Sequence, residues 1–344
     1  MLTGDCTEST IIANKEGHVI YMDEGGVATR PEISRNALAK LFLSNLPSEA
    51  IKWEYKLLSA TTVIVPDKTE TELEFGVNGK HTFDLVIGAD GAWSRVRNLL
   101  TGVKPEYAGM QIITLTIRQV TKKYPQLSEY IGLGSFAPLG LKHGVTTQRA
   151  SQDSARLYIW LTTEDENFGA TSGLVSQAAA TVKGKLLSDS ALLRQWGSKI
   201  KELVSVACDE ESKDNSGLKI DLKPLYTLPI GHTWEHKPGV TLVGDASHLM
   251  RPSGEGVNIG MLDSLLLYRA IVKAWETAIA GDGSFQHALE QPVREFEVDM
   301  WKRAKDKAEE AEELGKIMFG TEDGAQVMAH WFKSMMEQAA GAGQ

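Results

Sequence analysis

Two short segments of the sequence carry residue types that suit the binding of a nucleotide-like ligand. The first runs from Asp84 to Arg97 and contains Asp90-Gly91, and the second begins with Gly244-Asp245. In each, an apolar strand is followed by a turn of small residues, one carboxylate and a helix. Ligands of open α/β sheets bind at the carboxyl ends of strands, where glycines admit them to the backbone and helix N-termini offer N–H groups. We therefore expect a site at these turns, with Asp245 the better candidate for holding a sugar or ribityl hydroxyl.

A strand that ends in Gly-Asp has a second interpretation, because the aspartate can simply cap the helix that follows. Taken alone, the motif favours capping and ligand binding about equally. Two such motifs in one chain, separated by a strand-rich insert, are more specific for a binding site. Their combination is the strongest functional signal in the sequence.

Two further residues near the second motif have alternative roles. His248 could act as a general base, but a structural role beside the loop is the commoner one for such a histidine. Arg251 could meet an anionic ligand at a helix N-terminus, or it could pair with Glu255 on the surface. Both alternatives for Arg251 remain open from the sequence.

The elements that must position these residues follow from the hydrophobic pattern. Residues 83–87 and 240–243 read as parallel strands that end at the two motifs, and Asn78-Gly79 predicts a two-residue hairpin turn. Residues 110–165 predict a separate antiparallel sheet, and 173–207 predict helices. Two later helices are also expected: a buried one at about 257–274, apolar on most faces, and a long amphipathic one at 288–319.

Composition narrows the possible functions. The chain has 344 residues, with 36 Lys and Arg against 45 Asp and Glu, and a net charge of −9. This acidity argues against a general nucleic-acid binder, which needs a basic face. We expect no membrane span, because no apolar run reaches about 18 residues, and no signal peptide, because the N-terminus has no basic n-region and no apolar h-region. Two cysteines favour a reducing, cytoplasmic location, and the sequence makes no prediction of oligomeric state.

From about Arg30 to the end of the long helix, the sequence resembles the class A flavoprotein monooxygenases, the single-component aromatic hydroxylases and tetracycline-inactivating monooxygenases. Asp90-Gly91 matches the family's DG motif. Gly244-Asp245 through Asp263 matches its GD motif and the flavin loop that follows. Pro31 to Leu38 resembles a short R-x-x-L segment whose arginine, here Arg35, contacts the cofactor.

The resemblance implies an α/β fold: a Rossmann-like FAD/NAD(P)-binding domain, N-terminally truncated, with an inserted antiparallel β-sheet substrate domain and a long C-terminal helix. The corresponding parts of this chain are 1–108 and 229–285 for the FAD-binding domain, 109–228 for the substrate domain and 286–344 for the C-terminal helical region. Tyr158, Trp160 and Phe136 could line a substrate pocket, although the core of the sheet is their commoner place.

The activity implied by the resemblance is that of an FAD-dependent monooxygenase. NAD(P)H would reduce FAD, and one atom of O2 would pass to a small aromatic or polyketide-like substrate of secondary metabolism. Asp245 would bind the ribityl or phosphate region, Arg35 the diphosphate or ribityl chain, and the backbone of Gly254–Asn258 the isoalloxazine. No catalytic side chain is predicted. The cofactor-binding residues that the resemblance implies are Arg35, Asp90, Gly91, Gly244, Asp245, Pro252, Gly254, Gly256, Val257 and Asn258.

The family begins with a strand–GxGxxG–helix unit, and none is found upstream of Arg35. That strand would lie beside the strands of the Asp90 and Asp245 motifs, so its absence predicts unpaired backbone there. Three explanations are open. The chain is an incomplete gene product, another chain supplies the unit, or the sheet has closed up and the protein has changed its function.

The flavin loop also departs from the family pattern Pro-x-x-Gly-x-Gly. Here Pro252-Ser253-Gly254-Glu255-Gly256 is one residue shorter. The deletion shifts every later N–H of the loop, which either abolishes flavin binding or reshapes it. The alternative hypothesis is therefore a flavin-free relative that uses the cavity for a non-redox reaction, such as cyclisation, isomerisation or dehydration, or only for binding. An inactive fragment is a third.

Overall fold

The computed structural model describes residues 7–25, 32–65, 68–215, 217–281 and 284–342. Its internal contacts divide the chain into two compact units. The first unit contains Met1–Pro47, Gly109–Leu225 and Gly315–Gln344, and the second contains Ser48–Ala108 and Tyr226–Leu314. The four-part division by function given above stays a prediction, and each unit is described here by itself.

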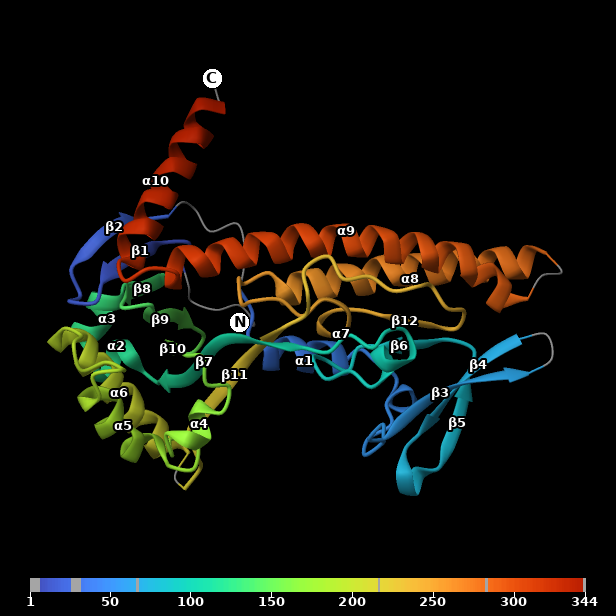
Figure 1. Ribbon diagram of the computed structural model, residues 1–344, viewed down its shortest axis with the longest axis horizontal. Helices are drawn as coiled ribbons and strands as arrows, with labels where there is room; N and C mark the ends of the chain where they lie inside the picture. Colours follow the sequence, from blue (N-terminus) through green and yellow to red (C-terminus); the bar gives the residue numbers. More distant parts are fainter. Residues whose placement is uncertain (1–6, 26–31, 66–67, 216, 282–283, 343–344) are drawn as a thin grey trace. The chain divides into compact units, whose positions relative to one another are not determined.

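The first unit is built on a seven-stranded sheet in the order β11-β7-β10-β9-β8-β1-β2 (Figure 1). Strands β7, β10, β9 and β8 follow one another antiparallel, as predicted, but β1 pairs with β8 in parallel, so the sheet is mixed. The strands of this sheet are β1 (Thr10–Asn14), β2 (Val19–Asp23), β7 (Glu106–Ile117), β8 (Ser135–Gly140), β9 (His143–Ala150), β10 (Ser154–Thr162) and β11 (Asp221–Thr227).

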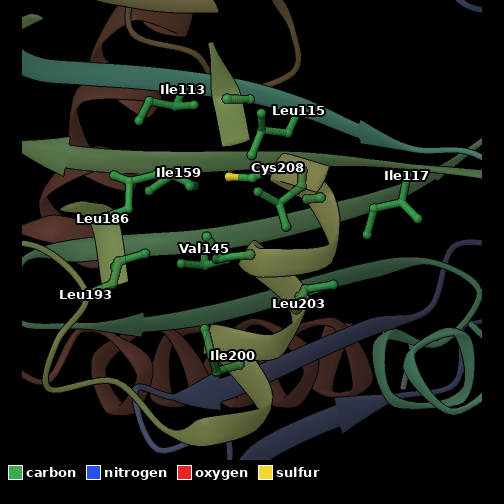
Figure 2. Packing of buried hydrophobic residues seen from close by; sticks show 14 of the residues in the cluster. Ile113, Leu115, Ile117, Val145, Ile159, Leu186, Leu193, Ile200, Leu203 and Cys208 are labelled. Carbon is green, nitrogen blue, oxygen red and sulfur yellow. The ribbon is translucent and has the colours of Figure 1, made fainter. Parts of the chain in front are cut away.

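Alternation along β10 shows how this sheet divides its two faces. Leu157 and Ile159 are completely buried, whereas Tyr158 and Trp160, which alternate with them along the strand, are half-buried on the other face. Successive side chains of a strand point to opposite faces, so one face is apolar and the other is aromatic and polar. Figure 2 shows the apolar face, where the Cys208 thiol lies among isoleucine and leucine side chains.

Helices of the first unit cover the apolar face of the sheet. Val182 and Leu186 of α5 and Ile200 and Leu203 of α6 are fully buried in the same hydrophobic cluster as Ile159. Farther along the chain, α10 packs against β1, β8 and β2, with Tyr21 and Phe332 stacked at 5.6 Å between ring centroids. The helices of this unit are α1 (Arg35–Leu43), α2 (Val120–Lys123), α3 (Pro125–Ile131), α4 (Phe168–Thr171), α5 (Ala179–Ser188), α6 (Ser198–Asp214) and α10 (Gly324–Ala342).

The second unit contains the two strands that end at the motifs. Strand β6 (Val86–Gly88) pairs in parallel with β12 (Val240–Leu242), as the sequence predicts, and in the described residues these two strands lie directly beside each other. A three-stranded antiparallel sheet is formed by β3 (Ser59–Val65), β4 (Lys68–Glu74) and β5 (Lys80–Phe83).

The connection between β4 and β5 differs from the prediction. It is a five-residue loop that contains a 3₁₀ turn, η2 (Gly76–Asn78), rather than a two-residue turn at Asn78-Gly79. Gly76 has a positive φ (+62°), which glycine adopts readily, so the chain reversal begins before Asn78-Gly79. Two more 3₁₀ turns, η1 (Ser48–Ala50) and η3 (Val96–Leu99), complete the short elements of this unit.

The helices of the second unit that follow β12 are α7 (Asp245–His248), α8 (Gly256–Ala280) and α9 (Phe285–Phe319). Helices α8 and α9 lie side by side in Figure 1 and share a core that includes Leu267, Val293 and Phe296. The long amphipathic helix predicted at 288–319 is confirmed as α9.

The expectation that the helix at 257–274 is a buried helix is wrong. Along α8 the buried residues are Ile259, Asp263, Leu267 and Ala274, which form one stripe at helical spacing. Tyr268 is 61 % exposed. The helix packs through a single face, so its apolar composition overstates its burial.

Among the described helices, none combines the length and the apolar character that a bilayer crossing requires.

Candidate functional site

The turn after β6 is ordered by Asp90. Its Oδ1 accepts a hydrogen bond from Ser94 Oγ at 2.5 Å, and its Oδ2 accepts from Arg95 N at 2.7 Å. Gly91 follows with a φ of +79°, which favours glycine. Asp90 therefore stabilises the chain reversal that leads into η3.

Gly88 allows η3 to pack against the paired strands. A Cβ at this position would lie 2.6 Å from Leu242 Cδ2 and 2.8 Å from Val96 Cβ. Glycine is the residue that fits this contact without displacing β12 or η3.

Arg97, which the sequence analysis did not select, connects the two motifs. Its side chain is 2 % exposed, and it donates to Ala246 O at 2.9 Å and to Ala92 O at 2.5 Å. Burial lowers the pKa of this guanidinium, partly offset by Asp90. Because Ala92 lies in the turn of the first motif and Ala246 lies in α7, one side chain fixes the two turns relative to each other.

The second motif places a carboxylate at the end of β12. Gly244 has a φ of +60° and is the N-cap of α7, with no side-chain hydrogen bond to the cap. Asp245 is the first residue of α7 and is exposed. The capping interpretation of Asp245 is therefore not the one the structure adopts, and its carboxylate is accessible to a ligand hydroxyl.

The loop from Pro252 to Gly256 is open. Gly254 has a φ of +90°, and no atom lies within 4 Å of a Cβ built there or at Gly256. The N-cap of α8, Glu255, makes no side-chain capping bond. The backbone N–H groups of Gly256, Val257 and Asn258 therefore form a helix N-terminus suited to negative charge.

Ser253 adds a second polar feature to this loop. Its Oγ is buried without a hydrogen-bond partner in the part of the chain that the structure describes. Buried hydroxyls are normally hydrogen-bonded, so this oxygen is an unsatisfied polar atom within the loop.

A buried network lies beneath the Gly244 turn. Asp263, which is fully buried on α8, accepts from Gly244 N at 3.2 Å, from His248 Nε2 at 2.6 Å and from Arg303 at 3.0 Å. His248 is thus held by a carboxylate, which agrees with the structural role expected for it. Asp263 ties the turn to both α8 and α9.

A second buried carboxylate supports β12 from α9. Glu297 is fully buried and accepts from Trp234 Nε1 at 3.2 Å, from Thr241 Oγ1 at 2.9 Å and from His236 Nδ1 at 2.7 Å. Thr241 lies in β12 itself, so Glu297 fixes the strand that carries Asp245.

Arg251 does not form the pair with Glu255 that the sequence offers as one alternative. Its Nε donates to Glu312 Oε2 at 2.6 Å, so it pairs with α9 instead of Glu255. Glu255 instead lies 3.4 Å from the Asn258 side-chain amide. The partner is distant in sequence, and no local pattern indicates it.

The remaining candidate residues divide between the units. Asp90, Gly91 and the residues from Gly244 to Asn258 all belong to the second unit. Arg35 belongs to the first unit, where it is exposed at the start of α1, just after the N-cap Ser34.

Taken together, the second unit offers an exposed strand-end carboxylate, an open glycine loop and a helix N-terminus. This donor set fits a ligand with hydroxyl groups and delocalised negative charge, as FAD has. In the described stretches, no group of three or more His, Cys, Asp or Glu side chains could hold a metal ion.

Comparison with known proteins gives consistent similarities. No family model matches the chain. It is 31 % identical over 340 residues to the monooxygenase penA of Penicillium thymicola, covering 88 % of this chain and 76 % of penA. It is equally similar, over 342 residues and the same shares, to the monooxygenase asqM of Emericella nidulans. The solved structure of Klebsiella pneumoniae HpxO complexed with FAD and uric acid superimposes with a TM-score of 0.69 at 16 % identity, covering 97 % of this chain and 77 % of HpxO.

Proposed function

We propose that this chain, which belongs to the class A FAD-dependent monooxygenases, binds FAD at the strand-end turns of its second unit. NAD(P)H is the reductant and O2 the oxidant. The observation that carries the proposal is the exposed Asp245 carboxylate together with the open loop at 254–258, in a chain that is 31 % identical to monooxygenases over most of its length.

Each predicted residue has a distinct part in this proposal. Asp245 would bind the ribityl or phosphate region, and the resemblance implies that Arg35 would hold the diphosphate or ribityl chain. The N–H groups of Gly256, Val257 and Asn258 stabilise negative charge on the isoalloxazine through the N-terminus of α8. When bound, FAD supplies the hydride acceptance and oxygen activation, while the protein orients it and excludes water.

The substrate proposed is a small planar molecule, aromatic or polyketide-like. Tyr158 and Trp160 lie half-buried on the polar face of the seven-stranded sheet, and Trp160 Nε1 donates to Thr146 Oγ1 at 2.8 Å. Aromatic rings stack favourably against planar rings. Phe136, in contrast, is fully buried in the core on the opposite face and is not part of this surface. The similarity to fungal monooxygenases supports a role in secondary metabolism.

The compartment proposed is a reducing one, the cytoplasm. Cys208 is a free, buried thiol whose pKa is raised to about 12 by burial. A thiol in this state is inert and needs no oxidising compartment. Imaging of a fluorescent fusion would test this location, and accumulation in a membrane-bounded organelle would contradict it.

The test is FAD binding followed by turnover. The purified chain, D245A and the control D306A, which removes an exposed aspartate on α9, are titrated with FAD by flavin fluorescence. We expect D245A to weaken FAD binding about tenfold or more, as for loss of a hydrogen bond to a charged group, and D306A to leave it unchanged.

Turnover is then measured as NAD(P)H oxidation with a panel of aromatic substrates, and ¹⁸O₂ is used to label the product. Label in the organic product supports a monooxygenase. Conversion of a substrate without label, flavin or NAD(P)H would favour the flavin-free alternative.

A further inference from the structure

A small cavity lies behind the second motif, within the second unit. It has a volume of about 20 Å³ and is formed where the end of α7, the loop at 228–232 and α9 meet. Its lining includes His232, His248 and Trp301. Its lining includes neither Asp245 nor any residue of the loop at 252–256.

The protonation of His248 follows from its contacts. Asp263 receives hydrogen bonds from a backbone N–H and an arginine as well as from His248 Nε2. An ionised carboxylate satisfies all three donors, so Nε2 carries the proton. In the neutral ring Nδ1 is then an acceptor, and this atom is buried without a partner among the described residues, in a side chain only 8 % exposed.

The indole of Trp301 on α9, which also lines the cavity, needs a hydrogen-bond acceptor. Trp301 Nε1 can only donate, and it too is buried without a partner in the described structure. His232 completes the wall. Burial lowers its pKa, with Arg97 and His248 adding to the effect and the Ser247 and Thr233 backbone opposing it. Its ring is therefore neutral, with one donor and one acceptor nitrogen, and both nitrogens are buried without a well-aligned hydrogen bond.

We propose that this cavity binds one ordered water molecule, which accepts from Trp301 Nε1 and donates to His248 Nδ1, with His232 as its third partner. A bridging ligand must both accept and donate, and it must be small. A cavity needs about 10–15 Å³ to hold a water, and buried waters typically make about three hydrogen bonds to otherwise unsatisfied groups. The space and the three polar groups meet both conditions.

The water gives Trp301 and His248 a positioning role. It fixes His248 with the proton on Nε2, which keeps Asp263 as the acceptor for Gly244 N. Gly244 precedes Asp245, so the water holds the turn that presents the cofactor carboxylate. This last consequence rests on the proposed function, whereas the water site itself does not.

The test uses two matched tryptophans. W301F removes the donor that faces the cavity, and W234F removes an indole N–H that instead binds Glu297. In cofactor-free protein, ¹⁵N NMR of the histidine rings reports the His248 tautomer. We expect the Nε2–H tautomer in the wild type and in W234F, and a changed Nδ1 resonance in W301F. FAD affinity should fall about three- to tenfold in W301F, the range of one net hydrogen bond.

Two measurements on the wild type keep the proposal falsifiable should W301F fail to fold. A high-resolution crystal structure must show density for one water within hydrogen-bond distance of His248 Nδ1 and Trp301 Nε1, and water-selective cross-relaxation must reach the His248 ring. A cavity without that density, or the same His248 resonances in W301F and W234F, would overturn the water site. An intact site in a protein that binds no FAD would overturn only the proposed function.

Discussion

Both units of the molecule contain buried carboxylates, and Glu210 and Asp263 are stabilised in different ways. Glu210 on α6 of the first unit is 1 % exposed, and its partners are Tyr124 and two lysines whose side chains are 42 % and 65 % exposed. Asp263 of the second unit is fully buried, and its partners are a backbone N–H, a buried histidine and an arginine. Glu210 is neutralised by lysines whose side chains are exposed, whereas Asp263 is bound by groups that lie mostly inside the unit.

The difference shows what each carboxylate does. Glu210 joins α6 to the segment at α2 and α3 at the edge of an apolar core, so it contributes stability. Asp263 holds Gly244 N directly, so it determines the conformation of a turn. Removing a buried partner leaves uncompensated charge, which costs more than losing a pair that faces solvent. The comparison therefore predicts graded effects.

The largest effect is expected for D263N. The change leaves the Arg303 charge poorly compensated and weakens the contacts to His248 and Gly244, so the free energy of unfolding should fall by about 3–5 kcal/mol. Urea unfolding measures it. The matched control is D299N, because Asp299 pairs with the same Arg303 but is 58 % exposed; its cost should stay below about 1 kcal/mol. Equal losses of unfolding free energy in D263N and D299N would contradict the distinction between a buried and an exposed partner of Arg303.

The apolar core of the first unit is tested by L157A. Leu157 is fully buried in the centre of the sheet, so its truncation should cost about 2–5 kcal/mol through lost burial and the cavity left behind. The expected loss is in stability, with FAD affinity unchanged in the folded variant. If L157A lost FAD affinity at a temperature where it is fully folded, the core of the first unit would affect cofactor binding, which contradicts this prediction.

E210Q tests the surface-neutralised carboxylate through pH. Burial alone would raise the pKa of Glu210, but hydrogen bonds from Lys123, Lys213 and Tyr124 outweigh it and hold the pKa at about 2, below the ordinary 4.5. A depressed pKa contributes stability that is complete above pH 4.5 and is lost as pH falls through about 2. The free energy of unfolding of the wild type should exceed that of E210Q by about 2–3 kcal/mol at neutral pH.

The measurement for E210Q is the unfolding midpoint at several pH values. The difference in unfolding midpoint between the wild type and E210Q should become steadily smaller as the pH falls below 4.5. A gap that is constant over this range would show that the ionised carboxylate contributes nothing specific.

The smallest effect is expected for G88A. Its Cβ would clash with Leu242 and Val96, and overpacking of this kind costs about 1–3 kcal/mol. G102A is the control, since no atom lies within 4 Å of a Cβ there. Circular dichroism melts compare the two variants. A melting temperature for G88A as high as for G102A would mean that η3 can move away freely.

Much of the fold could be predicted from local patterns. The three-to-four spacing of apolar residues located α9 to within three residues at its start, and the apolar runs before the two Asp residues identified β6 and β12. The burial of α8 was overstated because composition does not reveal which helix faces have partners.

The supporting residues of the site could not be predicted from local patterns. Arg97 contacts an atom 149 residues away, and Glu297 binds Thr241 and His236 across 56 and 61 residues. Such pairs depend on how strands and helices fold together, and they leave no periodic signal. The motif residues themselves were visible because their spacing is local.

The most direct test of the account is the absorbance spectrum of the purified full-length chain after incubation with excess FAD and desalting. The account predicts that flavin bands are retained at close to one FAD per chain, and that D245A loses most of them. A wild-type protein that stays folded by circular dichroism but remains colourless would contradict the assignment of the Asp245 turn and the loop at 254–258 as a flavin site.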